Sequence, residues 1–113
     1  MQSRSIGLFA GFKIPVPFPD RLRMMRDAGF DATVLWWEED DAEKRALRHR
    51  VPNMVRAEDL AIDHIHVPYR GCNALWSPCE LERRAMVERH CGWVKDCARH
   101  GVPCMVMHVT QGR

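Results

Sequence analysis

Several features that would assign this chain to a membrane or secreted class are missing from its sequence. No apolar run approaches the roughly 20 residues that a transmembrane helix needs, and the N-terminal stretch MQSRSIGLFAGF carries no cleavage-site pattern. The five cysteines are odd in number and include no C-x-x-C pair, which argues against both a disulfide framework and a zinc knuckle. We therefore expect a cytoplasmic protein with reduced thiols and no membrane partner.

The chain also lacks an excess of charge of one sign. Its 17 basic and 15 acidic residues give a net charge of +2, and the two signs alternate along the stretches that we expect to be helical. No basic surface for nucleic acid is therefore favoured. The hydrophobic fraction of 46% is ordinary for a globular protein, and 113 residues allow at most one domain.

Among the motifs that are present, the segment IDHIHVPY at residues 62–69 is the most informative. Strand side chains alternate between faces, so Ile62, His64 and His66 are expected to share one face. Pro68 cannot donate to a sheet ladder, which ends the strand and leaves His66 at its C-terminal tip. The pattern recurs in PCMVMHVTQG, where His108 again ends a strand. The two histidines are therefore predicted to belong to one site.

Apolar runs and helical periodicity give a coarse order of β-α-β-α-β-α-β, which predicts parallel strands with right-handed crossovers. The strands are expected at residues 6–9, 32–37, 62–67 and 104–109. The helices are expected at residues 18–29, 52–60 and 78–100, with Gly29 and Gly101 as left-handed C-terminal caps. The charged segment EEDDAEKRALRHR is expected to be a solvated loop or a frayed helix.

The longest helix has a recognisable start in the sequence. Ser77-Pro78-Cys79-Glu80 fits a capping box, in which Ser77 caps the helix and Glu80 bonds back to it. Its buried face is predicted to be the stripe of Val87, Cys91, Val94 and Ala98.

Two architectures share this alternation of strands and helices. A doubly wound sheet would carry a G-x-G-x-x-G loop after its first strand, and GLFAGF lacks that spacing. A closed β/α barrel places its active-site groups at the C-terminal tips of its strands, where Glu38, His66 and His108 are expected to lie. The barrel therefore accounts for more of the residues.

Three segments also resemble a known family: AGFDATVLWWEE, IHVPYRGCNALW and DCARHGVPCMVMHVTQG. With their spacing, they are similar to the N-terminal half of the sugar phosphate isomerase/epimerase family of xylose-isomerase-like TIM barrels. The resemblance extends from about Ser5 to Gly112. Since a complete barrel takes about 250 residues, residues 1–113 would form one partial domain: the first half of a (β/α)8 TIM barrel, truncated after the fourth strand.

The resemblance implies functions for particular residues. In AP endonucleases of this superfamily, histidines that end the third and fourth strands bind zinc, which implies a metal-binding role for His66 and His108. In the sugar isomerases a single divalent metal (Mn, Mg or Zn) is held by side chains of later strands, which leaves open whether this chain holds any metal. Glu38 is the candidate acid or base for proton transfer.

A sugar or sugar phosphate is the substrate that the resemblance implies. Trp37, Asn73 and Trp76 are the candidate substrate-binding residues, with the tryptophans as apolar walls for a sugar ring. The implied reaction is a metal-assisted proton transfer or hydride shift. The first alternative is an AP-endonuclease-like zinc phosphodiesterase. The second is a non-catalytic half-barrel that self-associates through its open sheet edges.

Overall fold

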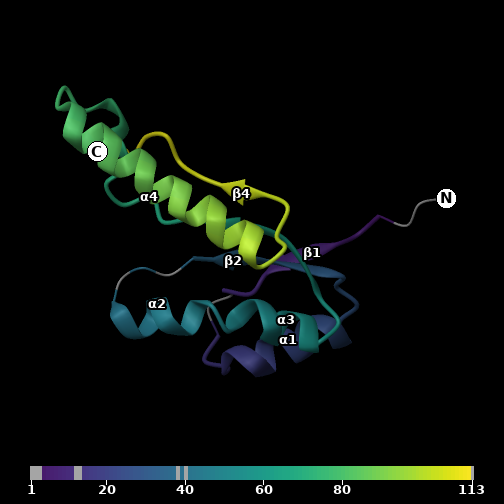
Figure 1. Ribbon diagram of the computed structural model, residues 1–113. Coiled ribbons are helices and arrows are strands. Elements are labelled where there is room, and N and C mark those ends of the chain that lie inside the picture. The colour runs from purple at the N-terminus through teal and green to yellow at the C-terminus, as the bar shows by residue number, and fades with distance from the viewer. Residues whose placement is uncertain (1–3, 12–13, 38, 40, 113) are drawn as a thin grey trace.

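The computed structural model describes residues 4–11, 14–37, 39 and 41–112 (Figure 1). The described residues form an α/β structure with four strands, four α-helices and one 3-10 helix. In chain order these are β1 (Gly7–Phe9), α1 (Phe18–Asp27), β2 (Ala32–Trp36), α2 (Ala42–Arg48), α3 (Val51–Ala57), β3 (Ala61–His66), η1 (Cys72–Trp76), α4 (Glu80–Arg99) and β4 (Met105–Val106). The predicted strand positions are confirmed, although β4 is shorter than expected.

The sheet is parallel throughout and has the order β1-β2-β3-β4. Neighbours in the sheet are therefore also neighbours in the sequence, and β1 and β4 form the two edges. Because all strands run in the same direction, their C-terminal ends lie side by side at one end of the sheet, where the two predicted histidines are found. The expected strict alternation of strand and helix is interrupted between β2 and β3, where α2 and α3 follow each other.

A β-bulge in β3 changes which of its side chains share a face. Thr33 of β2 pairs with Ile62, but the next residue, Val34, pairs with His64, so Asp63 is the extra residue. Ile62 therefore lies on the face opposite to His64. The prediction that Ile62 shares a face with the histidines was wrong, because a bulge shifts the period-two alternation by one residue.

Helices cover one face of the sheet. Leu35 of β2 and Ile65 of β3 are paired neighbours, and both are buried. They belong to a single core with side chains of α1, α3 and α4, namely Leu22, Met25, Val55, Trp93 and Cys97. Burying an aliphatic side chain fully contributes about 1.5–3 kcal/mol. This core is therefore the main source of stability.

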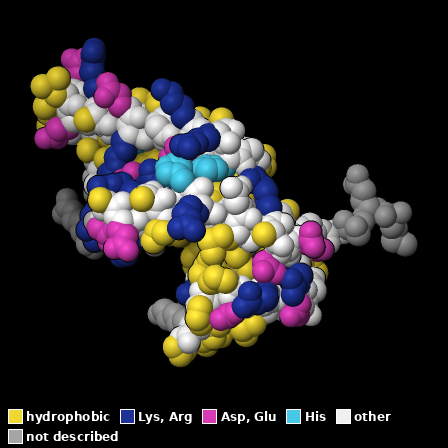
Figure 2. Space-filling view, turned by 60° about the horizontal axis from the view of Figure 1, so that its bottom comes forward, with side chains coloured by type: hydrophobic (Ala, Val, Ile, Leu, Met, Phe, Trp, Pro, Cys, Tyr) yellow, Lys and Arg dark blue, Asp and Glu magenta, His cyan; other side chains and the backbone are white. Residues whose placement is uncertain are grey.

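The other face of the sheet is only partly covered. Its strand pairings run from Phe9 on β1 to Val106 on β4. We call this surface the open face and define it by Phe9, Val34, Trp36, His64, His66 and Val106, none of which is buried. Elsewhere, Figure 2 shows charged side chains of both signs mixed over the surface that it presents. The open face is thus a half-exposed apolar surface that carries two histidines.

Two helices differ from the prediction in detail. The charged segment forms α2, which begins after Asp41 because the Asp41 carboxylate accepts the backbone N–H of Lys44 at 2.7 Å. Helix α4 begins after Cys79, whose N–H donates to Ser77 Oγ at 3.1 Å. The Ser77 hydroxyl bonds Glu82, so the predicted capping box with Glu80 does not form.

The buried face of α4 lies one residue earlier than predicted. Val87 and Val94 of the predicted stripe are 51% and 53% exposed, and Cys91 and Ala98 are exposed too. The buried side chains are Met86, His90, Trp93 and Cys97. Met86 is adjacent to Val87 in this helix, and Trp93 is adjacent to Val94. Met86 and Trp93 are the larger members of these pairs, and burying them removes more apolar surface from water.

The ends of the helices agree with the prediction. Gly29 and Gly101 have φ values of +87° and +63°. A residue with a Cβ atom rarely adopts this left-handed backbone conformation, so glycine ends both helices with little conformational strain. No helix among the described residues is long and apolar enough to cross a membrane.

Candidate functional site

The structure brings His66 and His108 together. Their Nε2 atoms lie 3.2 Å apart, and their ring centroids lie 5.1 Å apart. His66 ends β3 on the open face and is half-buried, whereas His108, two residues beyond β4, is exposed. A contact between two imidazoles at this distance requires that at least one nitrogen is unprotonated and accepts. The two side chains that the sequence places at strand tips therefore form a pair.

The environment of this pair favours the neutral form of His66. Burial lowers the pKa of His66, the bond to the Val67 carbonyl opposes this in part, and the neighbouring imidazoles of His108 and His64 lower the pKa a little further. A neutral imidazole is the form that binds a metal ion. His64 itself contacts the carboxylate of Asp63 at 2.7 Å, which makes it a locally bonded side chain.

Two further aromatic rings surround the histidine pair. The Trp36 indole stacks on His66 with a centroid distance of 5.1 Å and an interplanar angle of 23°. The Tyr69 ring lies 6.0 Å from Trp36 and 5.3 Å from His108. From the sequence, Trp36 is a possible apolar wall for a sugar ring but is not among the three residues predicted to bind substrate; it lies at the end of β2.

The separation of the two Nε2 atoms can be compared with that of two nitrogen ligands on one ion. Two nitrogens that each bind zinc at 2.0–2.1 Å with tetrahedral angles lie about 3.3 Å apart, close to the 3.2 Å between the Nε2 atoms. Among the described residues no group of three or more His, Cys, Asp or Glu side chains is placed to hold a metal. Within the described residues, these two imidazoles are therefore all that this position offers to an ion. The candidate acid or base, Glu38, lies outside the described residues.

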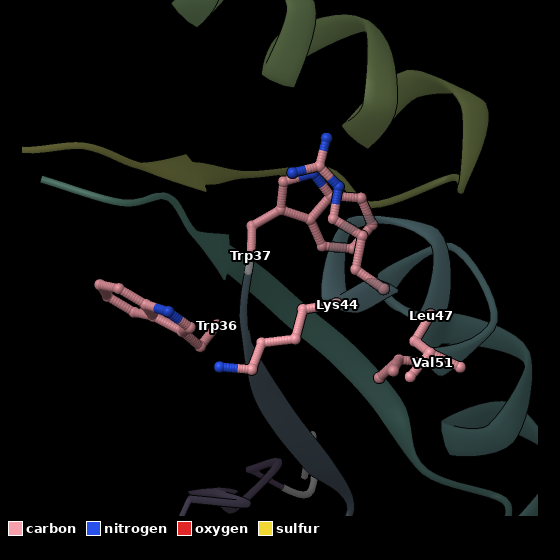
Figure 3. A pocket seen from close by; sticks show the side chains of 6 residues that line it. Trp36, Trp37, Lys44, Leu47 and Val51 are labelled. Atoms are coloured by element: carbon pink, nitrogen blue, oxygen red, sulfur yellow. The ribbon is translucent and has the colours of Figure 1, made fainter. Parts of the chain in front are cut away.

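Trp37 lies on the opposite side of the sheet from the histidines. Its side chain is 1% exposed, and its indole N–H donates to the Asp96 carboxylate on α4 at 2.9 Å. Figure 3 shows Trp36 and Trp37 pointing in different directions from β2. Because adjacent strand residues point to opposite faces, Trp36 and not Trp37 lies on the same side of the sheet as the histidine pair.

Asn73 and Trp76 lie beside the chain that follows His108. The Asn73 side-chain amide donates to the Gln111 carbonyl at 3.0 Å and accepts the Gln111 N–H at 2.7 Å. The Trp76 indole N–H donates to the Val109 carbonyl at 2.6 Å, and the ring remains exposed. These bonds fix η1 against residues 109–111, so both predicted side chains border the site and help to position its backbone.

A cavity of about 280 Å³ lies next to Trp36, between the end of β2 and the helices α2 and α3 (Figure 3). Its lining combines an aromatic face, aliphatic side chains and two cations, and consists of Trp36, Trp37, Lys44, Leu47, Arg48 and Val51. The Lys44 side chain reaches towards Trp36 in this view. The cavity thus offers a flat apolar wall beside a positive charge.

Glu39 anchors the chain immediately after β2. Its carboxylate accepts the Trp93 indole N–H at 2.8 Å and two bonds from the Arg89 guanidinium, at 2.9 and 2.5 Å. Arg48 lies 3.3 Å away. Burial raises the pKa of Glu39, but the bonds from Arg89, Trp93 and Arg48 outweigh it and leave the pKa below its ordinary value. This network, which the sequence did not reveal, joins the β2 tip to α2 and α4.

A second histidine pair packs against Trp37. His49 Nδ1 lies 2.9 Å from His100 Nε2, and both rings meet the Trp37 indole edge-on, at 5.3 and 5.6 Å. Burial lowers the pKa of both histidines. Nearby arginines (Arg48, Arg56 and Arg99) add to this effect, and the Asp96 carboxylate opposes it.

This second pair predicts a loss of stability in acid. A folded-state pKa below the unfolded value means that the stabilisation is complete above the unfolded pKa of about 6.5 and is lost as the pH falls through the folded value. Urea titrations should show a falling free energy of unfolding between pH 7 and pH 5. In a His49→Gln, His100→Gln double variant this slope should become smaller, with His66 responsible for part of the remainder. An unchanged slope would contradict the assignment.

Comparison with known proteins gave no match: no protein family, no curated protein and no solved structure is significantly similar to this chain.

Proposed function

We propose that this chain is part of a xylose-isomerase-like barrel that acts on a sugar or sugar phosphate in the cytoplasm. One observation carries the proposal: the Nε2 atoms of His66 and His108 lie 3.2 Å apart at the C-terminal ends of β3 and β4, and the His66 ring stacks on Trp36. The free thiols of all five cysteines agree with a reducing compartment. The sequence resemblance supplies the reaction class, a metal-assisted isomerisation or epimerisation.

His66 and His108 would hold a divalent ion (Mn, Mg or Zn) through their Nε2 atoms. Such an ion supplies Lewis-acid polarisation of a carbonyl oxygen. Trp36 offers the flat face against which the apolar side of a sugar ring packs. Lys44, in the same cavity as Trp36, is a suitable partner for a phosphate group. Glu38 would accept or donate the proton at the carbon next to the carbonyl.

Metal binding by the histidine pair is the direct test of this site. We expect Co²⁺ to bind the wild-type chain and to give the visible absorption of a nitrogen-bound ion. His66→Ala and His108→Ala should each weaken binding at least tenfold, because a single imidazole remains. His64→Ala is the matched control, since His64 bonds Asp63, and should bind as the wild type does.

The reaction itself is tested by proton exchange. With Mn²⁺ present, ketose phosphates incubated in D₂O should gain deuterium next to the carbonyl, as followed by NMR, and Lys44→Ala should reduce this exchange for phosphorylated sugars more than for free sugars. Equal binding of Co²⁺ by the histidine variants, or neither deuterium exchange nor formation of an isomer or epimer with any sugar phosphate, would contradict the proposal.

A zinc phosphodiesterase that acts on abasic DNA is the second candidate. It is favoured by the same pair, because two histidines at the ends of the third and fourth strands are the feature shared with AP endonucleases. The two functions separate cleanly by substrate. Zinc-dependent cleavage of an abasic oligonucleotide, without exchange on sugar phosphates, would select the phosphodiesterase. Failure to shift the mobility of that DNA at low salt would exclude it.

A further inference from the structure

Both edges of the sheet are unusually free of charge. Residues 5–11, which contain β1, and residues 102–112, which contain β4, include no Asp, Glu, Lys or Arg, although 28% of the whole chain is charged. Natural sheets protect exposed edges with charges, and with lysine in particular, because an edge presents unpaired backbone groups to other chains. These two edges lack that protection.

Apolar side chains are exposed along the same two segments. Phe9 on β1 is 47% exposed, and Ile6 just before it is also exposed. Beyond β4, Met107 is 36% exposed, and Val109 is exposed as well. The two edges therefore continue the apolar character of the open face to both of its sides.

The backbone of β1 directs hydrogen-bonding groups outwards. The Ile6 carbonyl accepts the Asp31 N–H at 2.9 Å, and the Ile6 N–H donates to the Asp31 carboxylate at 3.0 Å, so Ile6 faces β2. In a parallel strand the N–H and C=O groups of successive residues alternate in direction. Gly7 and Phe9 therefore direct theirs away from the sheet.

The backbone of β4 does the same on the other side. The carbonyls of Cys104 and Val106 accept the N–H groups of Ile65 and Val67 on the β3 side, at 3.1 and 3.0 Å. By the same alternation, Met105 and Met107 direct their groups away from β3. Each edge thus carries a row of groups that another parallel strand could pair with.

The monomer is also larger than a compact protein of its mass. Its accessible surface is 7903 Å², about 1,500 Å² more than the roughly 6,400 Å² expected for a compact 13.1 kDa monomer. Its radius of gyration is 15.8 Å, against about 13 Å expected. A standard interface buries about 800 Å² on each partner. The excess is large enough for a permanent interface.

We propose that a second copy of this chain covers the open face, with β1 of each copy paired in parallel with β4 of the other. A two-fold axis along the strands makes both seams at once, keeps all strands parallel and leaves no edge. Four strands from each copy give eight, the number at which side chains just fill a barrel interior. This assembly does not depend on the proposed isomerase activity.

The two-fold assembly completes the histidine site. The C-terminal ends of all eight strands would lie at one mouth, and the open faces of both copies would form the interior. His66 and His108 of each copy then face the same opening, which brings four imidazoles to a site where one copy supplies two. Trp36 of each copy would line the same interior.

Sedimentation velocity of the full chain tests the assembly. We expect a species of twice the 13.1 kDa chain mass. A Phe9→Lys, Met107→Lys double variant should sediment as a monomer with unchanged helical circular dichroism, because it charges both edges. The matched control, Val87→Lys with Val94→Lys, charges two similarly exposed apolar positions on α4 and should remain a dimer.

A direct contact measurement covers the case in which the edge variant does not fold. In a mixture of ¹³C-labelled and unlabelled wild-type chains, isotope-filtered NMR should show proximity between the Phe9 ring of one copy and the Val106 methyl groups of the other, because both side chains lie on the open face. A wild-type chain that stays at 13.1 kDa at 100 µM, or a dimer dissociated by the α4 variant and not by the edge variant, overturns the proposal.

Discussion

A Trp37→Ala substitution is expected to lower the free energy of unfolding by about 4 kcal/mol. The indole fills the space between the sheet and the helices, and it contacts the His49–His100 pair. The Arg48 guanidinium lies 5.1 Å from the centre of the Trp37 ring, and the Trp37 indole N–H donates to the Asp96 carboxylate. Removing it opens a large cavity, breaks a bond between β2 and α4, and takes away much of the 5–15 kcal/mol that stabilises a typical domain.

Trp36→Ala is the matched control for that experiment. The two tryptophans are adjacent, but Trp36 lies on the open face and is only half-buried. Measured at concentrations at which the chain is monomeric, its loss should cost about 1 kcal/mol, the value of an aromatic pair, and should instead alter the environment of His66. Urea denaturation monitored by circular dichroism measures both variants. Similar costs for Trp36 and Trp37 would mean that the assignment of the two faces is wrong.

A Glu39→Ala substitution is expected to lower the free energy of unfolding by about 2–3 kcal/mol, somewhat less than for a fully buried ion pair because the Glu39 side chain is 19% exposed. Without the carboxylate, Arg89 and the Trp93 indole lose a shared acceptor. Glu39→Gln should cost less, because an amide oxygen can still accept from Trp93. Chemical denaturation of the three proteins at pH 7 measures the difference.

The pH dependence of Glu39 provides an independent check. Because its folded-state pKa is lowered, its contribution is complete above the unfolded pKa of about 4.3 and is lost as the pH falls through the folded value. The difference between wild type and Glu39→Gln should therefore shrink in acid. Glu88→Ala, at an exposed position on α4, should change stability by no more than about 0.5 kcal/mol. If Glu88→Ala lowers the free energy of unfolding as much as Glu39→Ala does, the loss of the Glu39 network is not the cause of the effect.

The elements of the sheet could be predicted from local sequence signals. Strand 32–36 is an apolar run that begins shortly after Gly29, and the C-terminal tip of strand 61–66 follows from Pro68, two residues beyond it. The pairing of His66 with His108 follows as well, because parallel neighbouring strands end at the same edge. What these histidines bind remains a prediction.

Two features of the fold could not be predicted in this way. The bulge at Asp63 depends on how β3 aligns with β2, and no residue of β3 alone marks it. The buried face of α4 was misassigned because two apolar stripes lie side by side on this helix. Met86 and Trp93 belong to the buried stripe, and Val87 and Val94 belong to the exposed one. Periodicity cannot decide between adjacent stripes, whereas the space beneath the helix can.

The Glu39 network and the His49–His100 pair show the same limit at longer range. The partners of Glu39 are Arg48, Arg89 and Trp93, which follow it in the sequence by 9, 50 and 54 positions. His49 contacts His100, which lies 51 positions further along the chain. The sequence by itself determined the parallel α/β order and the two histidines at strand tips, because hydrophobic periodicity and proline act over a few residues. Only the tertiary structure decided which faces are buried and which charges meet, because packing and ion pairing depend on segments that folding brings together.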